Sequence, residues 1–473
     1  MAPGARASPR NQEALIKTNA LFSPRGRSPA SILVGLLWCV ALLSMVVIGV
    51  LHTSRMDLTV TKNYGDRIQA RYLALAGVEK AKALLYHNAR DRSRSAKNHT
   101  GELYNDPGEF RDVAFGRGQF RVFRRGQSYE GNGVIYGISD EESRLNMNTA
   151  ATNELQELEG MTAPIAAAII DWRDQDNEVT PGGAEAEYYN SLQPPYQPRN
   201  GPFETIRELL MVRGVTPDLF LGKDIHQNGM LESTGEAEDS DDLTRRPAIE
   251  DGDTGWSGIV TVDSTVQNVN AAGQDRVNIQ TADEASLTSV RGISAAIARA
   301  IVAYRGQNAF QSIADLLDVT APQSQNSSNA PASGALPGAG SDSKMVSEDL
   351  FMDIADDVTA DSNQNLAGSI NINTAGVDVL RCIPGVDREL AQAIVSYRQS
   401  SGYYPNVAWL FKVPGMTPEI FKQVAPLVSA RSETFRILSE GKINSTGVRQ
   451  RIQAIVHVGL NDIVTLSYRE DDL

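Results

Sequence analysis

Carboxylates are concentrated between residues 171 and 185, where their spacing suits metal binding. Asp174 and Asp176 stand two residues apart, and Glu185 follows further along the same stretch. Carboxylate oxygens at positions i and i+2 of a loop are a ligand pattern of hard cations, above all Ca²⁺. We therefore predict a calcium site formed by Asp174, Asp176 and Glu185, with Asp171 as a fourth candidate ligand. A solvated acidic loop is the alternative, in which Asp171 caps a helix or faces solvent.

The rest of the chain offers no set of residues suited to catalysis. It contains no P-loop and no HExxH, GxSxG or CxxC motif, and its five histidines are scattered. Its two cysteines, Cys39 and Cys382, lie far apart in the sequence and suggest no disulfide framework. We therefore expect this protein not to be an enzyme.

Three internal repeats form the most specific pattern of the chain. They begin with LNMNTA at Leu145, VNIQTA at Val277 and INTA at Ile372. Counted from the threonine of each copy, the same residue types return at equal offsets. The shared positions are Leu155, Leu287 and Leu380, then Gly160, Gly292 and Gly385, then Ala168, Ala300 and Ala393, and the pairs Trp172–Arg173, Tyr304–Arg305 and Tyr397–Arg398.

Each repeat is typical of a helix-hairpin-helix unit. Thr149, Thr281 and Thr374 are predicted to cap the first helix of their copies, and Thr281 and Glu284 have the spacing of a capping box. The shared glycine is predicted to end that helix in a left-handed residue. The shared alanine lies in the second helix, where its small side chain allows a close approach of the two helices.

Helix-hairpin-helix units raise the question of DNA binding. DNA-binding versions carry a second glycine two residues after the first, but Thr162, Ser294 and Asp387 occupy those positions here. The formal net charge of −14 also opposes binding to phosphates. We therefore expect the hairpins to serve packing or a protein partner, and we expect no nucleic-acid partner. The alternative function is a membrane-tethered DNA receptor for uptake, which should show a basic hairpin face.

The segment Ala30–Leu51 is predicted to be a membrane anchor. It holds 22 residues without a charge, and a helix of that length spans roughly 33 Å, enough for a bilayer core. A buried core helix rarely stays apolar on every face. A cleaved signal peptide is the other alternative, but no small-residue cleavage site follows the apolar run. Residues 1–29 carry five basic residues and one acidic residue, so we expect a cytoplasmic N-terminus and a translocated body.

The helix of the anchor is predicted to continue to about Asn88. No proline occurs from His52 to Asp106. The alternative is a break near Thr59–Gly65, where β-branched residues and a glycine lie. An apolar stripe runs along the second half of this helix and comprises Ile68, Tyr72, Leu75 and Val78. Since such a stripe buries apolar area best against like helices, we predict that these four residues form the assembly interface.

Alternating apolar residues predict strands on both sides of the repeats. Residues 119–124 and 134–138 are expected to form two short strands before the first repeat. Two strands are expected near the C-terminus, and their alternating residues are Ile452, Ala454, Val456 and Val458, then Val464, Leu466 and Tyr468. We expect the C-terminal strands to pair with the early ones across a gap of about 290 residues.

The acidic loop lies inside a stretch that resembles a known family. The run DW-x-D-x-D, then PGGAE-x-x-YY, PPY and N-x-PF between residues 171 and 203 resembles protein K of the type II secretion system, the large minor pseudopilin. The anchor, the long helix, the motif DEES-R-LNMNTA at residues 140–150, the hairpin repeats and the C-terminal strands follow in the order of that family. The resemblance therefore covers nearly the whole chain.

The resemblance implies an α+β fold. In it, an N-terminal transmembrane pilin helix packs on a small antiparallel sheet, which is split by a large all-α insertion of helix-hairpin-helix (SAM-like) repeats. It also implies a single-pass protein of the bacterial inner membrane with a periplasmic body, placed at the tip of the pseudopilus used for protein export. The implied partners are the other minor pseudopilins, the major pseudopilin and the prepilin peptidase. The resemblance further implies calcium in the helical domain.

The resemblance also implies processing of the N-terminus. Pilin-type leaders end in glycine just before the apolar run, so we expect cleavage between Gly26 and Arg27. Such a cut places Ser31 at the fifth mature position, where most pseudopilins carry glutamate and protein K does not. Two features depart from the family, because Arg27 stands where phenylalanine or methionine is usual and because three hairpin regions replace the usual two.

These observations divide the chain into eight expected segments. They are a leader (1–26), the transmembrane part of the pilin helix (27–51), the rest of that helix with the first strands (52–138), a first helix-hairpin-helix domain with the acidic loop (139–231), an acidic linker (232–255), a second helix-hairpin-helix domain with a flexible loop at 321–343 (256–360), a third one (361–431) and the C-terminal strands (432–473).

Overall fold

The computed structural model describes residues 30–98, 102–127, 130, 133–222, 255–321 and 344–470. The chain divides into two compact units, Met1–Tyr64 and Gly65–Leu473, and each is described by itself. The predicted α+β class, with a long apolar N-terminal helix, a small antiparallel sheet and helix-hairpin-helix repeats, is confirmed.

Helix α1 is continuous from Ala30 to Ser95, so the predicted single helix is confirmed and the alternative of a break near Thr59–Gly65 is wrong. Its apolar part in the first unit is long and apolar enough to cross a membrane. The side chains described there, up to Tyr64, are exposed. A helix that is apolar all round and uncovered by protein is what a lipid-facing segment requires.

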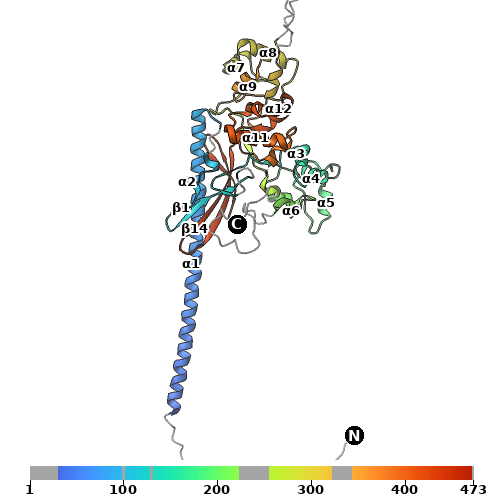
Figure 1. The fold of residues 1–473 in the computed structure, drawn as a ribbon. Helices are drawn as coiled ribbons and strands as arrows, with labels where there is room; N and C mark the ends of the chain where they lie inside the picture. Colours follow the sequence, from blue (N-terminus) through green and yellow to red (C-terminus); the bar gives the residue numbers. More distant parts are fainter. Residues whose placement is uncertain are drawn as a thin grey trace, which may run out of the picture. The chain divides into compact units, whose positions relative to one another are not determined.

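In the second unit, α1 lies along an antiparallel sheet of six strands (Figure 1). The strands are β1 (Val113–Phe115), β2 (Gly118–Val122), β5 (Ser139–Asp140), β14 (Thr434–Ile443), β15 (Arg449–Val458) and β16 (Ile463–Arg469). The order is β1-β2-β14-β15-β16, and β5 pairs with the start of β14. Strand β2 pairs with β14 from Val122 and Ser439 to Gly118 and Ile443. The two predicted C-terminal strands are β15 and β16, and they belong to the same sheet as the early strands. Their predicted direct pairing with the early strands is wrong, because β14 lies between β2 and β15.

Short elements connect α1 to this sheet and to the repeats. They are the 3₁₀ helix η1 (Glu102–Tyr104), helix α2 (Pro107–Phe110), and the hairpin of β3 (Arg124–Arg125) with β4 (Val134–Ile135). The strand predicted at residues 134–138 is therefore split, because β4 ends at Ile135 and the chain enters the main sheet only at β5.

Small residues allow α1 to approach the sheet closely. Ala70, Ala74 and Val78 are fully buried on the helix side. On the sheet, a Cβ atom at Gly441 would lie 2.1 Å from the carbonyl oxygen of Ala70. A Cβ atom at Gly77 would likewise lie 2.2 Å from Oγ of Ser439. Both contacts are too short for real atoms. A side chain at Gly441 would force the helix backbone away from the sheet, and one at Gly77 would force the Ser439 and Phe120 side chains to shift.

Three helical repeats occupy the insertion between β5 and β14. The first comprises β6 (Leu145–Asn146), α3 (Thr152–Gln156), α4 (Ala163–Arg173), α5 (Ala186–Asn190), η3 (Ile206–Met211), α6 (Pro217–Leu221), η5 (Trp256–Gly258) and β7 (Val260–Thr261). The second comprises β9 (Val277–Asn278), α7 (Glu284–Ser289), α8 (Ala295–Arg305), η6 (Ile313–Asp318), α9 (Glu348–Ile354) and β10 (Val358–Thr359). The third comprises β12 (Ile370–Asn371), α10 (Val377–Leu380), α11 (Arg388–Ser401), η7 (Val407–Lys412), α12 (Pro418–Val424), η8 (Ala425–Leu427) and β13 (Val428–Ser429).

Each repeat is closed by a short parallel pair of strands from its two ends. Strand β6 pairs with β7, β9 with β10, and β12 with β13. Val260–Thr261, which the sequence analysis assigns to the second helical domain, thus pairs with the first. Between the repeats, β8 (Thr265–Gln267) pairs antiparallel with β11 (Asn365–Ala367).

The shared Trp-Arg or Tyr-Arg pair of the repeats has a structural role. In the first copy, the Arg173 guanidinium donates to the carbonyl oxygens of Met147 and Ala150. Arg305 makes the equivalent bonds to Ile279 and Ala282 in the second copy, and Arg398 donates to Ile372 in the third. The arginine therefore holds the first loop of each repeat against its second long helix.

The prediction that threonine caps the first helix of each repeat is wrong. The N-cap residues of α3, α7 and α10 are Ala151, Asp283 and Gly376, each two residues after the threonine. The helix begins after the threonine because the threonine belongs to a turn, which is held by hydrogen bonds to the asparagine three residues before it. In the second copy, the Asn278 side chain accepts from the Gln280 N–H at 2.8 Å, and its carbonyl accepts from the N–H of Thr281.

The hairpin glycines adopt the left-handed conformation that the sequence predicts. Gly160, Gly292 and Gly385 have φ values of +74°, +103° and +83°. A Cβ atom at Gly160 would also lie 2.5 Å from the Leu219 side chain of α6. Both the turn and the packing of the second hairpin against the first therefore require glycine there.

The buried apolar residues of the three repeats form one continuous cluster. It runs from Leu145 in the first repeat through Leu287 in the second to Val428 in the third. A separate cluster lies between α1 and the sheet, with Val78 and Ala81 against Ile452 and Val456. The three repeats therefore form a single body rather than three domains on flexible connections.

Candidate functional site

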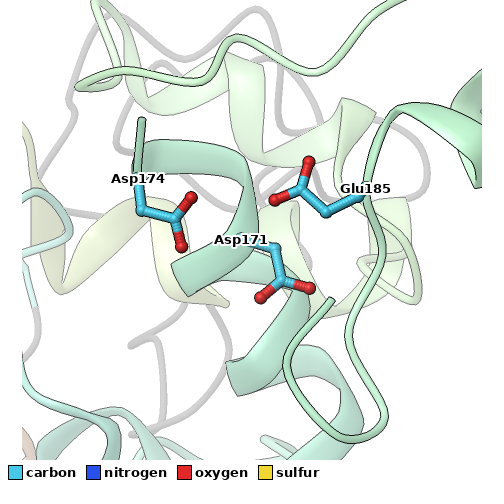
Figure 2. Close-up of side chains that lie close together, drawn as sticks. All are labelled: Asp171, Asp174 and Glu185. Carbon is cyan, nitrogen blue, oxygen red and sulfur yellow. The ribbon is translucent and has the colours of Figure 1, made fainter. Parts of the chain in front are cut away.

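Three of the predicted ligands, Asp171, Asp174 and Glu185, meet beside the end of helix α4. One carboxylate oxygen from each lies within 4.8 Å of the others. Asp171 lies in α4, Asp174 is the C-cap residue of that helix, and Glu185 is the N-cap residue of α5. In Figure 2, the carboxylates of Asp174 and Glu185 point toward each other. The end of one helix and the start of the next therefore position the cluster.

These carboxylates are largely buried and poorly satisfied. Asp171 and Glu185 are 0% and 2% exposed. Oδ1 of Asp171 accepts from the N–H of Thr180 at 3.2 Å. Oδ2 of Asp171, Oδ1 of Asp174 and both carboxylate oxygens of Glu185 have no hydrogen-bond partner among the described residues. Buried anionic oxygens without partners are costly, so this arrangement calls for a positive charge between them.

The electrostatics of the cluster indicate the same need. Burial, together with the charges of Asp174 and Asp171, raises the pKa of Glu185 to about 7. Burial and the charges of Asp176 and Asp171 also raise the pKa of Asp174. A divalent cation would reverse these shifts, because it stabilises the ionised form of every carboxylate that it contacts.

The Gly-Gly pair of the PGGAE motif lets the loop close over Asp171. A Cβ atom at Gly183 would lie 2.1 Å from Oδ2 of Asp171. The loop is held in place by the Gly183 N–H, which donates to the Thr180 carbonyl at 2.7 Å, and by Arg213, which donates to the Gly183 carbonyl at 2.9 Å. This explains why the motif needs glycine next to the acidic residues.

Asp176 is the predicted ligand that the structure does not bring into the cluster. Its Oδ1 accepts from the N–H of Glu178 at 2.8 Å, and its side chain is exposed. The other three residues still fit a hard cation, because three carboxylates supply the oxygen ligands that Ca²⁺ prefers. Asp171, Asp174 and Glu185 are thus the residues that would hold the ion, and the positive charge would satisfy their unpaired oxygens.

The predicted assembly stripe on α1 is divided between the surface and the core. Ile68 and Tyr72 are 40% and 58% exposed, whereas Val78 is 0% exposed and lies in the cluster between α1 and the sheet. Leu75 is half-buried and packs against the same cluster. The assignment of Val78 to an assembly interface is therefore wrong, because the side chain lies on the face of α1 that covers the sheet. The predicted processing residues Gly26 and Arg27 lie outside the described residues.

Sequence reasoning missed the buried acidic residues of the DEES motif. Asp140, Glu141 and Glu142 are 2%, 0% and 0% exposed at the junction of sheet and repeats. The Asp140 carboxylate accepts from four side chains, Thr374, Ser432, Asn371 and Tyr104, of which Asn371 and Thr374 belong to the third repeat. One carboxylate thus joins the end of β5 to the third repeat and to the chain just before β14.

The next two residues of the motif complete this acidic junction, defined here as Asp140, Glu141 and Glu142. Glu142 accepts from the backbone N–H groups of Thr434 and Thr265 at 3.1 and 3.2 Å. Glu141 binds Arg436 of β14 at 2.6 Å and accepts from the Thr261 hydroxyl of the first repeat at 2.5 Å. The acidic junction therefore contacts the sheet, the segments that close the repeats, and the third repeat.

The junction carboxylates differ in their protonation. Burial and the charge of Asp140 raise the pKa of Glu142 well above its ordinary value. Burial also raises the pKa of Asp140, although hydrogen bonds from Ser432 and Thr374 oppose the shift. Burial acts on Glu141 in the same direction, but the charges of Arg436 and Arg144 hold its pKa below the ordinary value. The surroundings therefore favour the protonated form of the Asp140–Glu142 pair and the ionised form of Glu141.

Of the three helix N-termini that a DNA backbone would need, those of α8 and α11 are capped by their own side chains, whereas Thr162 makes no such bond in α4. Thr162, Ser294 and Asp387 are the N-cap residues of α4, α8 and α11. The Ser294 hydroxyl accepts from the N–H of Ile297 at 3.3 Å, and the Asp387 carboxylate accepts from that of Leu390 at 2.8 Å. These bonds occupy N–H groups that could otherwise bind a phosphate.

Two family models match the chain. The family described as "Type II secretion system (T2SS), protein K" matches residues 138–222, which include the acidic junction and the carboxylate cluster. The family described as "Helix-hairpin-helix motif" matches residues 272–321 and 366–429, which cover most of the second and third repeats.

Curated relatives match parts of the chain. Type II secretion system protein K of Pectobacterium carotovorum subsp. carotovorum is 26% identical over 204 residues, 41% of this chain and 61% of that protein. Endonuclease/exonuclease/phosphatase family domain-containing protein 1 of Mus musculus is 26% identical over 161 residues, 33% of this chain and 28% of that protein. The chain thus spans less than two thirds of the first relative and less than one third of the second.

One solved structure is similar over most of the chain. It is the GspK-GspI-GspJ complex from the type 2 secretion system of enterotoxigenic Escherichia coli. The matching chain has a TM-score of 0.40 and 14% sequence identity, and the match covers 89% of this chain and 99% of that one.

Proposed function

Because the chain belongs to the type II secretion system protein K family, we propose that it is a minor pseudopilin at the tip of a type II secretion pseudopilus. The observation that carries this proposal is the match at residues 138–222, since that segment contains both the acidic junction and the carboxylate cluster. The proposed role is structural and involves no catalysis. Its partners are the other minor pseudopilins and the major pseudopilin.

The bulk of the helical insertion supports a place at the tip. In a filament built by stacking subunits through their N-terminal helices, lateral room is limited at every level. The three repeats share one buried core, so they form a single body that cannot spread apart to fit between neighbours. One copy at the end of the filament avoids the clashes that repeated copies would cause. Ser31 at the fifth mature position agrees with a topmost subunit, which has no neighbour above it.

We infer the membrane topology from α1 and its flanks. We propose that the apolar start of α1 spans the inner membrane once, with residues 1–29 in the cytoplasm and the body in the periplasm.

We further propose that Ca²⁺ binds Asp171, Asp174 and Glu185 and fixes the loop that joins α4 to α5. The four unpaired carboxylate oxygens support that assignment.

Replacement of exposed residues on α1 tests the proposed assembly. Ile68→Asp together with Tyr72→Asp should reduce co-purification of the full chain with its minor pseudopilins at least tenfold. Both side chains are exposed at the predicted interface, and loss of an interface hot spot costs about 2 kcal/mol or more. The measurement is the yield of complex from detergent-solubilised membranes.

Val179→Asp is the matched control, because Val179 is 56% exposed in the acidic loop and away from α1. It should leave the yield unchanged. Full co-purification of the double variant would reject the interface on α1. Homopolymers of the unmutated chain would reject the tip assignment.

Processing provides a separate test. Gly26→Phe should block removal of residues 1–26 while the chain still enters the membrane, since prepilin cleavage follows a small residue at this position. Arg27→Phe should be cut normally, because the change restores the residue usual in the family. Mass spectrometry of the membrane-extracted chain measures both. An identical mature mass for the Gly26 variant and the unmutated chain would contradict the cleavage site.

A further inference from the structure

Strand β16 (Ile463–Arg469) is an edge of the main sheet with an unpaired side. Among the described residues it pairs only with β15. From Ile463 to Tyr468, the outer side of β16 thus has no partner strand in the part of the chain that the structure describes, and exposed sheet edges of this kind recruit partners.

The side chains of β16 are unusual for an exposed edge. Val464, Leu466 and Tyr468 are 47%, 46% and 45% exposed. The strand contains no proline, lysine or acidic residue, and its one charged residue is the terminal Arg469. Soluble proteins normally protect edges with such residues, with β-bulges or with short strands, and of these β16 has only a bulge at Leu466.

The opposite edge of the same sheet provides the comparison. Strand β1 (Val113–Phe115) has three residues against seven in β16, and its exposed Phe115 is followed by Gly116 and Arg117. Both edges have charged residues nearby, but β1 is short, as expected of a strand that faces only solvent. The composition of β16 instead suits a strand with neighbours on both sides.

Both faces of β16 offer apolar contacts. Tyr468 lies opposite Ala454, which is buried in the cluster between α1 and the sheet. Val464 lies opposite His457. The two neighbours of His457, Val456 and Val458, are buried in that cluster, so His457 lies on the opposite face of the sheet. Since directly opposed residues share a face of the sheet, Tyr468 and Val464 lie on different faces. An added strand would therefore meet apolar side chains on each face.

The surface of β16 is continuous with the exposed stripe of α1. The Tyr468 hydroxyl donates to Oε1 of Glu470 at 2.6 Å, and Glu470 binds the guanidinium of Arg71 at 2.5 Å. That guanidinium lies 5.8 Å from the ring centroid of Tyr72. One row of contacts thus leads from the edge strand to the helix position assigned above to the assembly interface.

We propose that β16 is a pairing edge, which receives an extended strand from a neighbouring minor pseudopilin and thereby enlarges the sheet across the subunit boundary. This proposal rests on the proposed function, because it takes its partner from the pseudopilus tip. Backbone hydrogen bonds would supply affinity, and Val464, Leu466 and Tyr468 would select a strand with apolar side chains. The contact on α1 would set the two chains side by side.

Hydrogen–deuterium exchange of the full chain in detergent tests the pairing. The chain is measured alone and after co-expression with the minor pseudopilins of the same secretion system. Amides of Ile463–Arg469 should exchange at least tenfold more slowly in the complex, whereas those of β1 should not change. Protection of β16 in the chain alone that grows with concentration would mean that a second copy of this chain occupies the edge, and would overturn the proposal.

Charge variants complete the test. Val464→Lys together with Leu466→Lys should reduce the yield of complex at least tenfold, because lysine on an edge strand disfavours the addition of another strand. Both side chains are exposed, so the fold should be retained, and an unchanged melting temperature checks this. Phe115→Lys at the opposite edge is the matched control and should have no effect.

The outcomes separate this proposal from the function on which it rests. A complex that forms without protection of β16, and that tolerates both lysines, would reject the pairing edge and leave the pseudopilin assignment intact. Failure of the unmutated chain to co-purify with any minor pseudopilin would reject both.

Discussion

Replacement of Asp140 by alanine is expected to lower the free energy of unfolding by about 4 kcal/mol, because each buried donor left without an acceptor costs about 1–3 kcal/mol. Asp140 accepts from the side chains of Thr374, Ser432 and Asn371, which have no exposed position to move to. The loss should appear as a lower midpoint of urea-induced unfolding of the full chain, followed by circular dichroism.

Two variants serve as controls for this experiment. Asp140→Asn keeps one acceptor oxygen and should lose clearly less stability than the alanine variant. Asp176→Ala removes an exposed carboxylate and should change the free energy of unfolding by no more than about 0.5 kcal/mol. If Asp140→Ala were as stable as Asp176→Ala, the acidic junction would not hold the repeats to the sheet.

The acidic junction should also make stability depend on pH. Burial and the charge of Asp140 raise the pKa of Glu142 well above its ordinary 4.5, so the folded chain keeps a proton that the unfolded chain releases. The contribution of Glu142 is therefore most favourable below pH 4.5 and is lost as the pH rises toward its folded pKa. Glu142→Gln removes the ionisation and keeps an acceptor for Thr434. It should flatten the stability profile above pH 4.5, where the unmutated chain loses this contribution.

Addition of Ca²⁺ is expected to raise the melting temperature of the full chain. A ligand that binds only the folded state adds about 2.7 kcal/mol at a concentration one hundred times its Kd. The oxygens that would bind the ion are now unpaired, and Glu185 has its pKa raised to about 7. The affinity should fall below about pH 7, where Glu185 takes up a proton that competes with the ion. Differential scanning calorimetry at pH 8 and pH 6 measures both effects.

Glu185→Gln distinguishes a lost site from a damaged fold. At pH 8 in chelator, this variant should be at least as stable as the unmutated chain, because it removes a charge that Asp174 and Asp171 repel. It should not respond to Ca²⁺. Asp176→Asn lies outside the cluster and should retain most of the response. If Ca²⁺ does not change the melting temperature of the unmutated chain at pH 8, the calcium site is rejected.

Regular periodicity allowed much of the fold to be predicted. Ile452, Ala454 and Val456 alternate because β15 buries one face against α1, and this period identifies the strand without any knowledge of its neighbours. The hairpin glycines were likewise identifiable, since few residue types other than glycine adopt the left-handed backbone conformation that ends a helix there. The end of α1 was less predictable, because nothing in the sequence between Asn88 and Ser95 forces the helix to stop.

The errors arose where one pattern fits two environments. Val78 belongs to the same apolar stripe as Tyr72, but a helix that packs on the face of a sheet buries the part of the stripe that faces the sheet. Asp176 has the spacing of a ligand, yet the cluster uses Asp171 and Asp174, which are three residues apart at a helix end.

The acidic junction was missed for a related reason. Consecutive acidic residues such as Asp140, Glu141 and Glu142 normally indicate a surface. Their donors come from Thr261, Thr265, Asn371 and Thr434, which are far away in the sequence, so no local pattern could reveal the burial.

The pairing of β2 with β14 imposes an order of events on biosynthesis. The two strands are separated by all three repeats, and residue 122 leaves the ribosome more than three hundred residues before residue 439. Until the last strands arrive, α1 has only β1 and β2 to cover, and its buried face stays open to water. The repeats are closed by strand pairs within their own segments and can mature earlier. The length of the nascent chain therefore determines when the sheet can cover the apolar face of α1. Until the last strands are synthesised, a chaperone can bind that face, and it stays exposed longer than the cores of the repeats.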